Sequence, residues 1–184
     1  MTADWSPLWL SLRVALMVSV VALLVAPWPA WLLARRSWPV VTLIERFLAS
    51  VPAVIVASLA VPALTWPVAV AAGLVRAVPY TLAACRTAFQ SLDAGYVKAA
   101  RMTGASDWRI FWTLALPLDG QAALAAAAEV FAETMLEMAV ALWIGGRLSA
   151  PPAGAILLTA LAGGALALWL RRGAGAIRER QAGR

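Results

Sequence analysis

The chain has 184 residues, of which 63% are hydrophobic and 13% charged, and its formal net charge is +6. This composition is far more apolar than that of soluble globular proteins, so it indicates a membrane protein with no room for a separate soluble domain. A single cysteine excludes an internal disulfide, and the lack of histidine removes the commonest metal ligand and general base. The sequence therefore predicts no metal site, no bound cofactor and no catalytic residues.

Five apolar runs approach or exceed the length of about 20 residues that a helix needs to cross a bilayer. In chain order they cover residues 7–33, 47–64, 66–85, 121–144 and 153–170. The first run has no basic residue before it and contains Arg13, so we expect a retained span rather than a cleaved signal. The sequence predicts an all-α membrane protein, a single domain over residues 1–184 with about five transmembrane helices.

Basic residues follow the first, third and fifth runs and therefore gather on one side of the predicted bundle. Lys and Arg in short loops are retained on the cytoplasmic side of a membrane. We expect an outside N-terminus and an inside C-terminus, which places a loop over residues 88–119 in the cytoplasm. Topology and contact with anionic membrane lipid then explain the positive charge, and we expect no nucleic-acid partner.

The cytoplasmic loop combines helix-forming and helix-ending residues. Residues 99–102 favour a short helix, and Gly104 suits a left-handed cap at its end. Ser106 is placed to cap a second segment that Pro117 should end, and Asp119 is placed to cap the fourth span. The result would be a compact helix-turn-helix, which either docks on a cytosolic partner or rests on lipid headgroups.

Three glutamates, Glu129, Glu133 and Glu137, are spaced by four residues in the fourth run. Each step of four turns about 40° around a helix, so the three share one narrow face over about 12 Å. Acidic groups near the bilayer centre cost about 2.5 to 3.5 kcal/mol each, so this face should line a subunit interface or a wet cavity. Arg76 in the third run is the expected partner, in an ion pair with Glu133 or Glu129.

Tryptophans near the ends of the apolar runs are expected to anchor the chain at the membrane interface. They are Trp28, Trp31, Trp38, Trp66 and Trp143.

The segment "YVKAARMTGASDWRIFWTLALPL", residues 96–118, resembles the cytoplasmic EAA loop of ABC-importer permeases. That loop has the pattern Glu-Ala-Ala, three residues, Gly, and then Leu-Pro further on. The positions that fit are Ala99, Ala100, Gly104, Leu116 and Pro117. The loop is most similar to that of molybdate or tungstate permeases, and the likeness extends through residues 64–93 and 131–137.

The resemblance implies a type I ABC-importer permease in the bacterial cytoplasmic membrane, with a small oxyanion such as molybdate or tungstate as cargo. It implies three partners: a cytoplasmic ATPase that holds ATP and Mg²⁺, an extracytoplasmic substrate-binding protein, and a second permease chain in a homodimer. The family's coupling helix, which seats in a groove of the ATPase, falls on a short set of residues. These are Lys98, Ala99, Ala100, Arg101, Gly104 and Ala105.

The sequence departs from the family pattern at several positions. Lys98 stands where the family usually has glutamate, and Glu133 replaces a usual arginine, although Glu137 matches a family glutamate. The second run lacks the family's Pro-Pro pair, and three carboxylates would repel an oxyanion. Two alternatives to an active permease follow: a non-transporting or regulatory relative of such permeases, or a proton or cation pathway along the glutamates.

Overall fold

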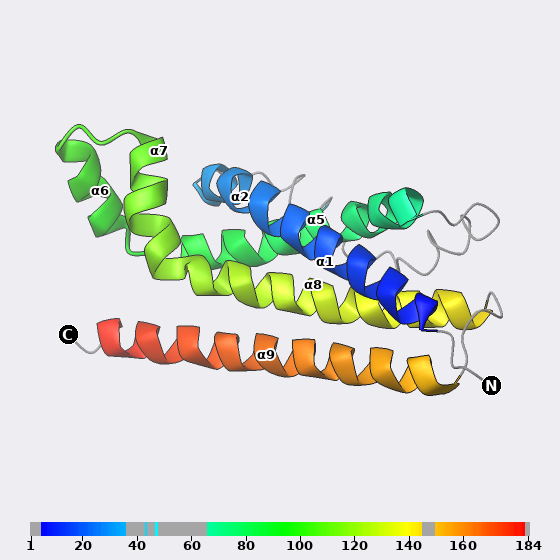
Figure 1. Cartoon of the computed structure of the whole chain (residues 1–184). Coiled ribbons are helices and arrows are strands. Elements are labelled where there is room, and N and C mark those ends of the chain that lie inside the picture. Colours follow the sequence, from blue (N-terminus) through cyan, green and yellow to red (C-terminus); the bar gives the residue numbers. More distant parts are fainter. Residues whose placement is uncertain (1–4, 36–42, 44–46, 48–65, 145–149, 183–184) are drawn as a thin grey trace.

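The computed structural model describes residues 5–35, 43, 47, 66–144 and 150–182. Every regular element within these residues is a helix, in agreement with the predicted class (Figure 1). The elements are α1 (Ser6–Val25), α2 (Pro27–Ala34), α5 (Trp66–Gln90), α6 (Ala94–Met102), α7 (Asp107–Ile110), the π-helical turn η2 (Phe111–Ala115), α8 (Leu116–Ile144) and α9 (Ala150–Ala182). The predicted second span, residues 47–64, lies outside the described residues except for Phe47.

Three described segments are long and apolar enough to cross a membrane: Ser6–Ala34, Trp66–Gln90 and Ala153–Gly173. They coincide with the first, third and fifth predicted spans, although the third continues beyond residue 85 to Gln90. Helix α8 contains the predicted fourth span and has 29 residues. It carries three glutamates, whereas the three apolar segments named above carry none. The count of five spans and the orientation of the termini stay predictions.

A proline divides the first span into α1 and α2. Pro27 has no backbone N–H and so cannot continue the helical hydrogen bonds at its own position. The helical path nevertheless resumes at once, because Ala26 N donates to Ala22 O at 2.9 Å and Ala30 N donates to Ala26 O at 3.0 Å. The two helices therefore form one interrupted span.

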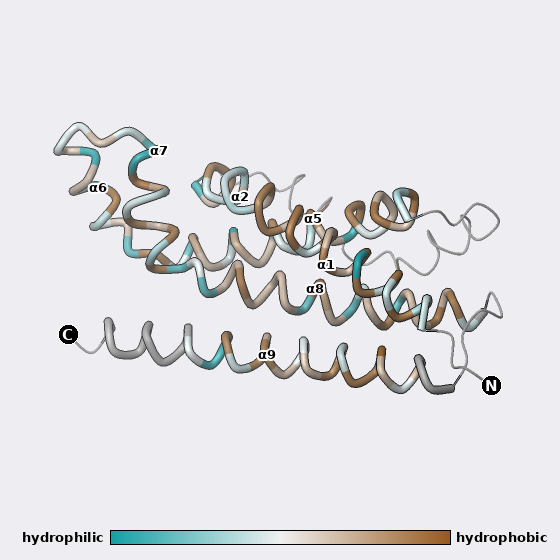
Figure 2. The backbone as a smooth tube through the Cα atoms, viewed as in Figure 1, coloured by the Kyte–Doolittle hydropathy of each residue, from teal (hydrophilic) through white to brown (hydrophobic). Residues whose placement is uncertain are grey.

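Helix α8 lies at the centre of the bundle, with α9 alongside it and α1 and α5 packed on its other sides (Figure 1). Small residues let these helices approach closely, as is typical of packing within membranes. A Cβ at Gly73 of α5 would lie 2.8 Å from Val18 Cγ2 of α1, and a Cβ at Gly163 of α9 would lie 3.0 Å from Phe131 Cδ1 of α8. Apolar residues remain on the outside of α1 and α9, where lipid would cover them (Figure 2).

Trp31 is a core residue and not an interface anchor, contrary to the sequence prediction. Its side chain is 1% exposed. Its ring meets that of Phe89 edge to face, with centroids 5.6 Å apart, and the Arg35 guanidinium lies 3.9 Å from the Trp31 ring centroid. The α7–η2 segment folds back over this part of α2 and covers the ring. Trp66 and Trp143 remain exposed, whereas Trp38 lies outside the described residues.

Candidate functional site

Helix α6 is the core of the predicted coupling segment, and its bounds differ from those predicted. It begins at Ala94, because the Asp93 side chain caps it by accepting a hydrogen bond from Gly95 N at 2.8 Å. It ends at Met102, so Lys98 to Arg101 lie within the helix while Gly104 and Ala105 lie beyond it. The predicted segment 98–105 is thus the second half of a helix together with its turn.

Gly104 forms the predicted left-handed cap. Its φ is +79°, the one positive φ recorded within the described part of the chain. Gly104 N donates to Arg101 O at 3.0 Å and Ala105 N donates to Ala100 O at 3.2 Å, the paired bonds that close a helix sharply. A Cβ at Gly104 would meet nothing within 4 Å, so the backbone conformation and not space requires glycine there.

Polar contacts join α6, α7 and the end of α2. The Ser106 side chain caps α7 as predicted, accepting from Arg109 N at 3.3 Å. Arg101 Nη2 donates to Asp107 Oδ1 at 2.8 Å, and Arg35 Nη1 lies 3.7 Å from the same oxygen. The hydrogen bond from Arg101 is the main cause that holds the pKa of Asp107 below its usual range, with the charges of both arginines adding to it. The sequence analysis did not predict this three-residue cluster.

Pro117 does not end the second segment, contrary to the sequence prediction. The helical path runs without a break from α7 through η2 into α8. A proline at residue 117 would clash with the carbonyl four residues earlier in a regular α-helix, and the wider π-helical turn relieves that contact. Leu116 N accordingly donates to Phe111 O, five residues back. Asp119 therefore lies buried in the first turn of α8 and does not precede that helix as a cap.

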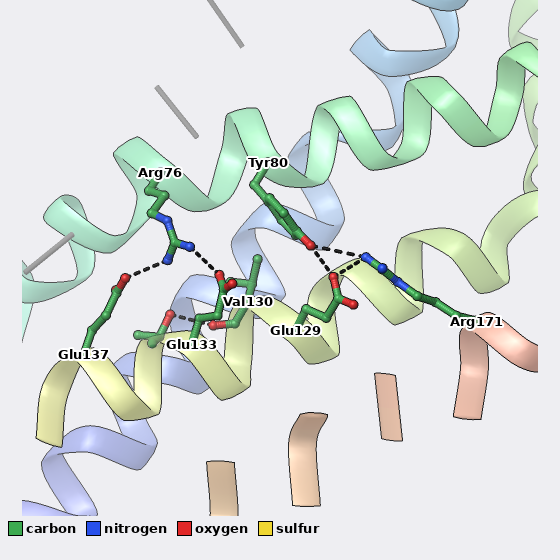
Figure 3. A network of polar contacts seen from close by, with 8 residues as sticks. Arg76, Tyr80, Glu129, Val130, Glu133, Glu137 and Arg171 are labelled. Atoms are coloured by element: carbon green, nitrogen blue, oxygen red, sulfur yellow. Dashed lines mark hydrogen bonds and ion pairs between the residues drawn. The ribbon is translucent and has the colours of Figure 1, made fainter. Parts of the chain in front are cut away.

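The second group of functional candidates is a charged seam, defined as Arg76 and Tyr80 of α5, the three glutamates of α8, and Arg171 of α9 (Figure 3). Arg76 Nη2 lies 2.7 Å from Glu133 Oε2, which confirms the predicted pair. Its other terminal nitrogen, Nη1, lies 2.6 Å from Glu137 Oε1. One guanidinium thus binds carboxylates from two successive turns of α8.

Glu129 has different partners, and the sequence analysis missed both. It accepts hydrogen bonds from the Tyr80 hydroxyl and from Arg171 Nη2, and Arg171 Nη2 also lies 3.2 Å from Tyr80 Oη. The signal for Tyr80 was present, because it lies four residues after Arg76 and so shares its helix face. Arg171 follows the fifth run, where the sequence predicts only that basic residues lie on the cytoplasmic side of the membrane.

The seam pairs its charges but leaves one carboxylate in excess, with three acidic and two basic side chains. The side chain of Glu133 is 40% exposed, whereas that of Glu137 is 18% exposed. The cavity beside Arg76, Glu133 and Glu137 has a volume of about 10 Å³, roughly the space of one water. The two cavities recorded at the seam among the described residues, of about 10 and 20 Å³, are too small for an oxyanion.

Within the described residues, no group of three or more His, Cys, Asp and Glu side chains has the arrangement of a metal site.

A bundle of apolar helices, with a polar helix-turn-helix at one end and paired charges between its helices, defines a multi-helix membrane protein. Residues 7–177 match the family described as the inner membrane component of binding-protein-dependent transport systems, and the chain belongs to this family. The resemblance to ABC-importer permeases is thereby confirmed.

Two relatives place the chain near one branch of this family. The molybdenum transport system permease protein ModB of Escherichia coli (strain K12) is 30% identical over 138 residues, which cover 62% of this chain and 60% of that protein. The ModB protein of Haemophilus influenzae is 29% identical over 151 residues, which cover 70% of this chain and 66% of that protein. The chain thus spans about 60% to 66% of the length of the curated relatives it matches.

Proposed function

We propose that this chain is the permease subunit of an ATP-driven importer in the bacterial cytoplasmic membrane, and that α6 is the helix on which a separate ATPase acts. One observation carries the proposal: the hairpin formed by α6 and α7 is packed on the bundle through α7 and η2, and α6 adds the partly buried Val97 and Ala100 to the same core. Ile110 and Phe111 are 1% and 3% exposed and pack with Phe89 and Trp31. A force on the hairpin would therefore pass directly to α2, α5 and α8, through packed side chains.

The outer surface of α6 supplies groups that a partner can bind. Tyr96 is 60% exposed and Met102 is 83% exposed, and Lys98 is exposed on the side of the helix that borders α2 and α5. Large exposed apolar side chains with a charge among them are typical of a docking surface. Because Lys98 replaces the family's glutamate, we expect an acidic residue facing it in the groove of the ATPase.

The cargo we propose is a small oxyanion such as molybdate or tungstate, and the relatives' names, which give molybdenum, support molybdate. The importer would also need a second copy of the chain and an extracytoplasmic binding protein. We propose that Arg76, Glu129, Glu133 and Glu137 line the interface of the two copies or the pathway between them. Arg76 and Arg171 pair with these carboxylates and so reduce the repulsion that the carboxylates would otherwise exert on an anion.

The experiment is co-purification of the chain with its co-expressed ATPase, followed by ATPase assay in liposomes with loaded binding protein. We expect Gly104→Trp to lose the ATPase, because the bulky residue is strained at φ +79° and crowds the docking turn. Gly104→Asn should retain it, because asparagine tolerates this conformation. Gly164→Trp is the matched control, since a Cβ there also meets nothing within 4 Å but lies on α9, away from α6.

Either of two results would count against the importer. Wild-type chain that folds but binds no ATPase would exclude coupling through α6. Wild-type chain that binds the ATPase without any stimulation by cargo-loaded binding protein would favour the non-transporting relative, an alternative that Lys98 and Glu133 raise by departing from the family pattern.

A further inference from the structure

A cavity of about 790 Å³ opens between the ends of α2 and α5 and one side of α6. It is separate from the charged seam and faces the side of α6 that carries Val97, Lys98 and Arg101. Its volume lies within the range of sites that hold small organic ligands, roughly 300 to 1,000 Å³. The functions described above make no use of it.

The inner wall of the cavity is apolar. Leu32, Leu33, Leu92 and Val97, all at least partly exposed, form its floor and sides. Trp31 and Phe89 lie behind them in the buried aromatic core. Apolar walls of this kind favour a ligand with a hydrocarbon part, because water in contact with them is released when it binds.

The rim of the same cavity is basic. It carries Arg35, Lys98 and Arg101, with Asp107 as the one acidic residue among its described lining residues. Asp107 is shared by Arg101 at 2.8 Å and Arg35 at 3.7 Å, whereas Lys98 makes no recorded polar contact within the described residues. Burial, followed by the charge of Arg101, holds the pKa of Arg35 below its usual value despite Asp107. The described rim carries three basic side chains and one carboxylate, so its positive charge is in excess.

The cavity lies where two membrane segments end, since Ser6–Ala34 and Trp66–Gln90 both terminate at its edge. Its apolar wall therefore adjoins the apolar ends of both segments, and its basic rim lies on the side of the polar hairpin. This order of apolar and basic surface matches the order of acyl chain and phosphate in a phospholipid.

We propose that this cavity is a binding site for an anionic phospholipid, whose phosphate contacts Lys98, Arg35 and Arg101 and whose upper acyl chain lies on Leu32, Leu92 and Val97. A free phosphate or a soluble oxyanion would use the rim and leave the apolar floor in water. A bound lipid would also brace α6 against α2, a consequence that rests on the proposed function because it concerns coupling.

The test measures lipid retention on the purified full chain, with no ATPase present, so its outcome is independent of the importer proposal. Protein in mild detergent is incubated with equal amounts of phosphatidylglycerol and phosphatidylcholine, and the retained lipids are counted by native mass spectrometry. We expect a preference for phosphatidylglycerol that falls about fivefold in Lys98→Gln, since each basic residue near an anionic headgroup has an effect of this order. Lys98→Arg should retain the preference.

Arg109→Gln is the matched control, because Arg109 is exposed on the same hairpin but does not line the cavity. An equal loss in Arg109→Gln would mean general attraction to a basic surface and would overturn the site. Equal retention of phosphatidylcholine would overturn the role of the basic rim. Displacement of phosphatidylglycerol by excess inorganic phosphate would contradict a phospholipid as the ligand and would indicate a site for a free anion. Lys98 is exposed, so Lys98→Gln should fold normally, which its melting temperature checks.

Discussion

At the scale of single residues, the structure shows how a strongly apolar chain retains ionised side chains. Arg76 neutralises Glu133 and Glu137 together, and its planar guanidinium suits two separate carboxylates because its terminal nitrogens diverge. Two hydroxyl groups in buried helix positions are also satisfied locally: Ser19 Oγ donates to Ala15 O and Thr134 Oγ1 donates to Val130 O, each at 2.7 Å. Removing a partner from such a site leaves an unpaired polar group where water is scarce.

Asp107 should make the hairpin sensitive to acid. Its pKa is lowered in the folded chain, so its contribution to stability is present above the unfolded pKa and is lost as pH falls through the lowered folded pKa. We expect the protection of backbone amides in α6 and α7 against hydrogen exchange, corrected for intrinsic exchange rates, to decrease as the pH falls through the lowered pKa of Asp107. The effect should stay below about 1 kcal/mol, because the pair is exposed.

Asp107→Asn should show the reduced protection already at neutral pH and should lose that part of the acid dependence. Arg109→Gln, which leaves the Arg101–Asp107 contact in place, should behave like the wild type. Unchanged protection in Asp107→Asn at neutral pH would contradict the prediction.

At the scale of elements, local chemistry and packing decide different features of each helix. Asp93 and Gly104 set the ends of α6 through hydrogen bonds within a few residues, so the sequence predicted its left-handed cap. The continuation of α8 through Pro117 required something else. The covered face formed by Ile110 and Phe111 holds this segment against the bundle, and the π-helical turn accommodates the proline.

Two neighbouring glycines of α9 provide a direct comparison of packing. A Cβ at Gly163 would lie 3.0 Å from Phe131 Cδ1 and 3.4 Å from Ala132 Cβ, while a Cβ at Gly164 would meet nothing within 4 Å. We expect Gly163→Leu to separate α8 from α9 and to destabilise the fold by about 1 to 3 kcal/mol. Thermal melting in detergent measures the difference.

Gly164→Leu, the same substitution one residue later, should leave the melting temperature near that of the wild type. Equal melting temperatures for the two variants would show that the close approach at Gly163 does not stabilise the pair of helices.

At the scale of the whole molecule, the charged seam joins three helices that are far apart in sequence. Arg171 reaches from α9 to Glu129 of α8 and Tyr80 of α5 (Figure 3). The apolar contacts of α9 are mainly with α8, so this polar contact is its recorded link to α5 among the described residues. The seam therefore links the last helix to the third span as well as to α8.

A charge exchange tests this link. Arg171→Glu should place two carboxylates together and lower stability by about 1 to 2 kcal/mol, a value reduced for the exposure of Arg171. The double variant Glu129→Arg, Arg171→Glu should recover most of the loss, as measured by melting temperature and by proteolysis of α9. Arg172→Glu changes the same charge at the next residue and should have little effect. A double variant no more stable than Arg171→Glu would contradict the link.

The sequence by itself determined the membrane class, the three described spans, the cap at Gly104 and the family, because composition, run length, turn chemistry and motif order are all local properties of the chain. It also predicted the Arg76–Glu133 pair, because a charge within the membrane needs a partner and few were present. Only the tertiary structure decided that Arg76 also binds Glu137, that Glu129 binds Tyr80 and Arg171, and that the Trp31 side chain is buried. These outcomes depend on the rotation and depth of helices from distant parts of the chain, which are fixed when their side chains pack together.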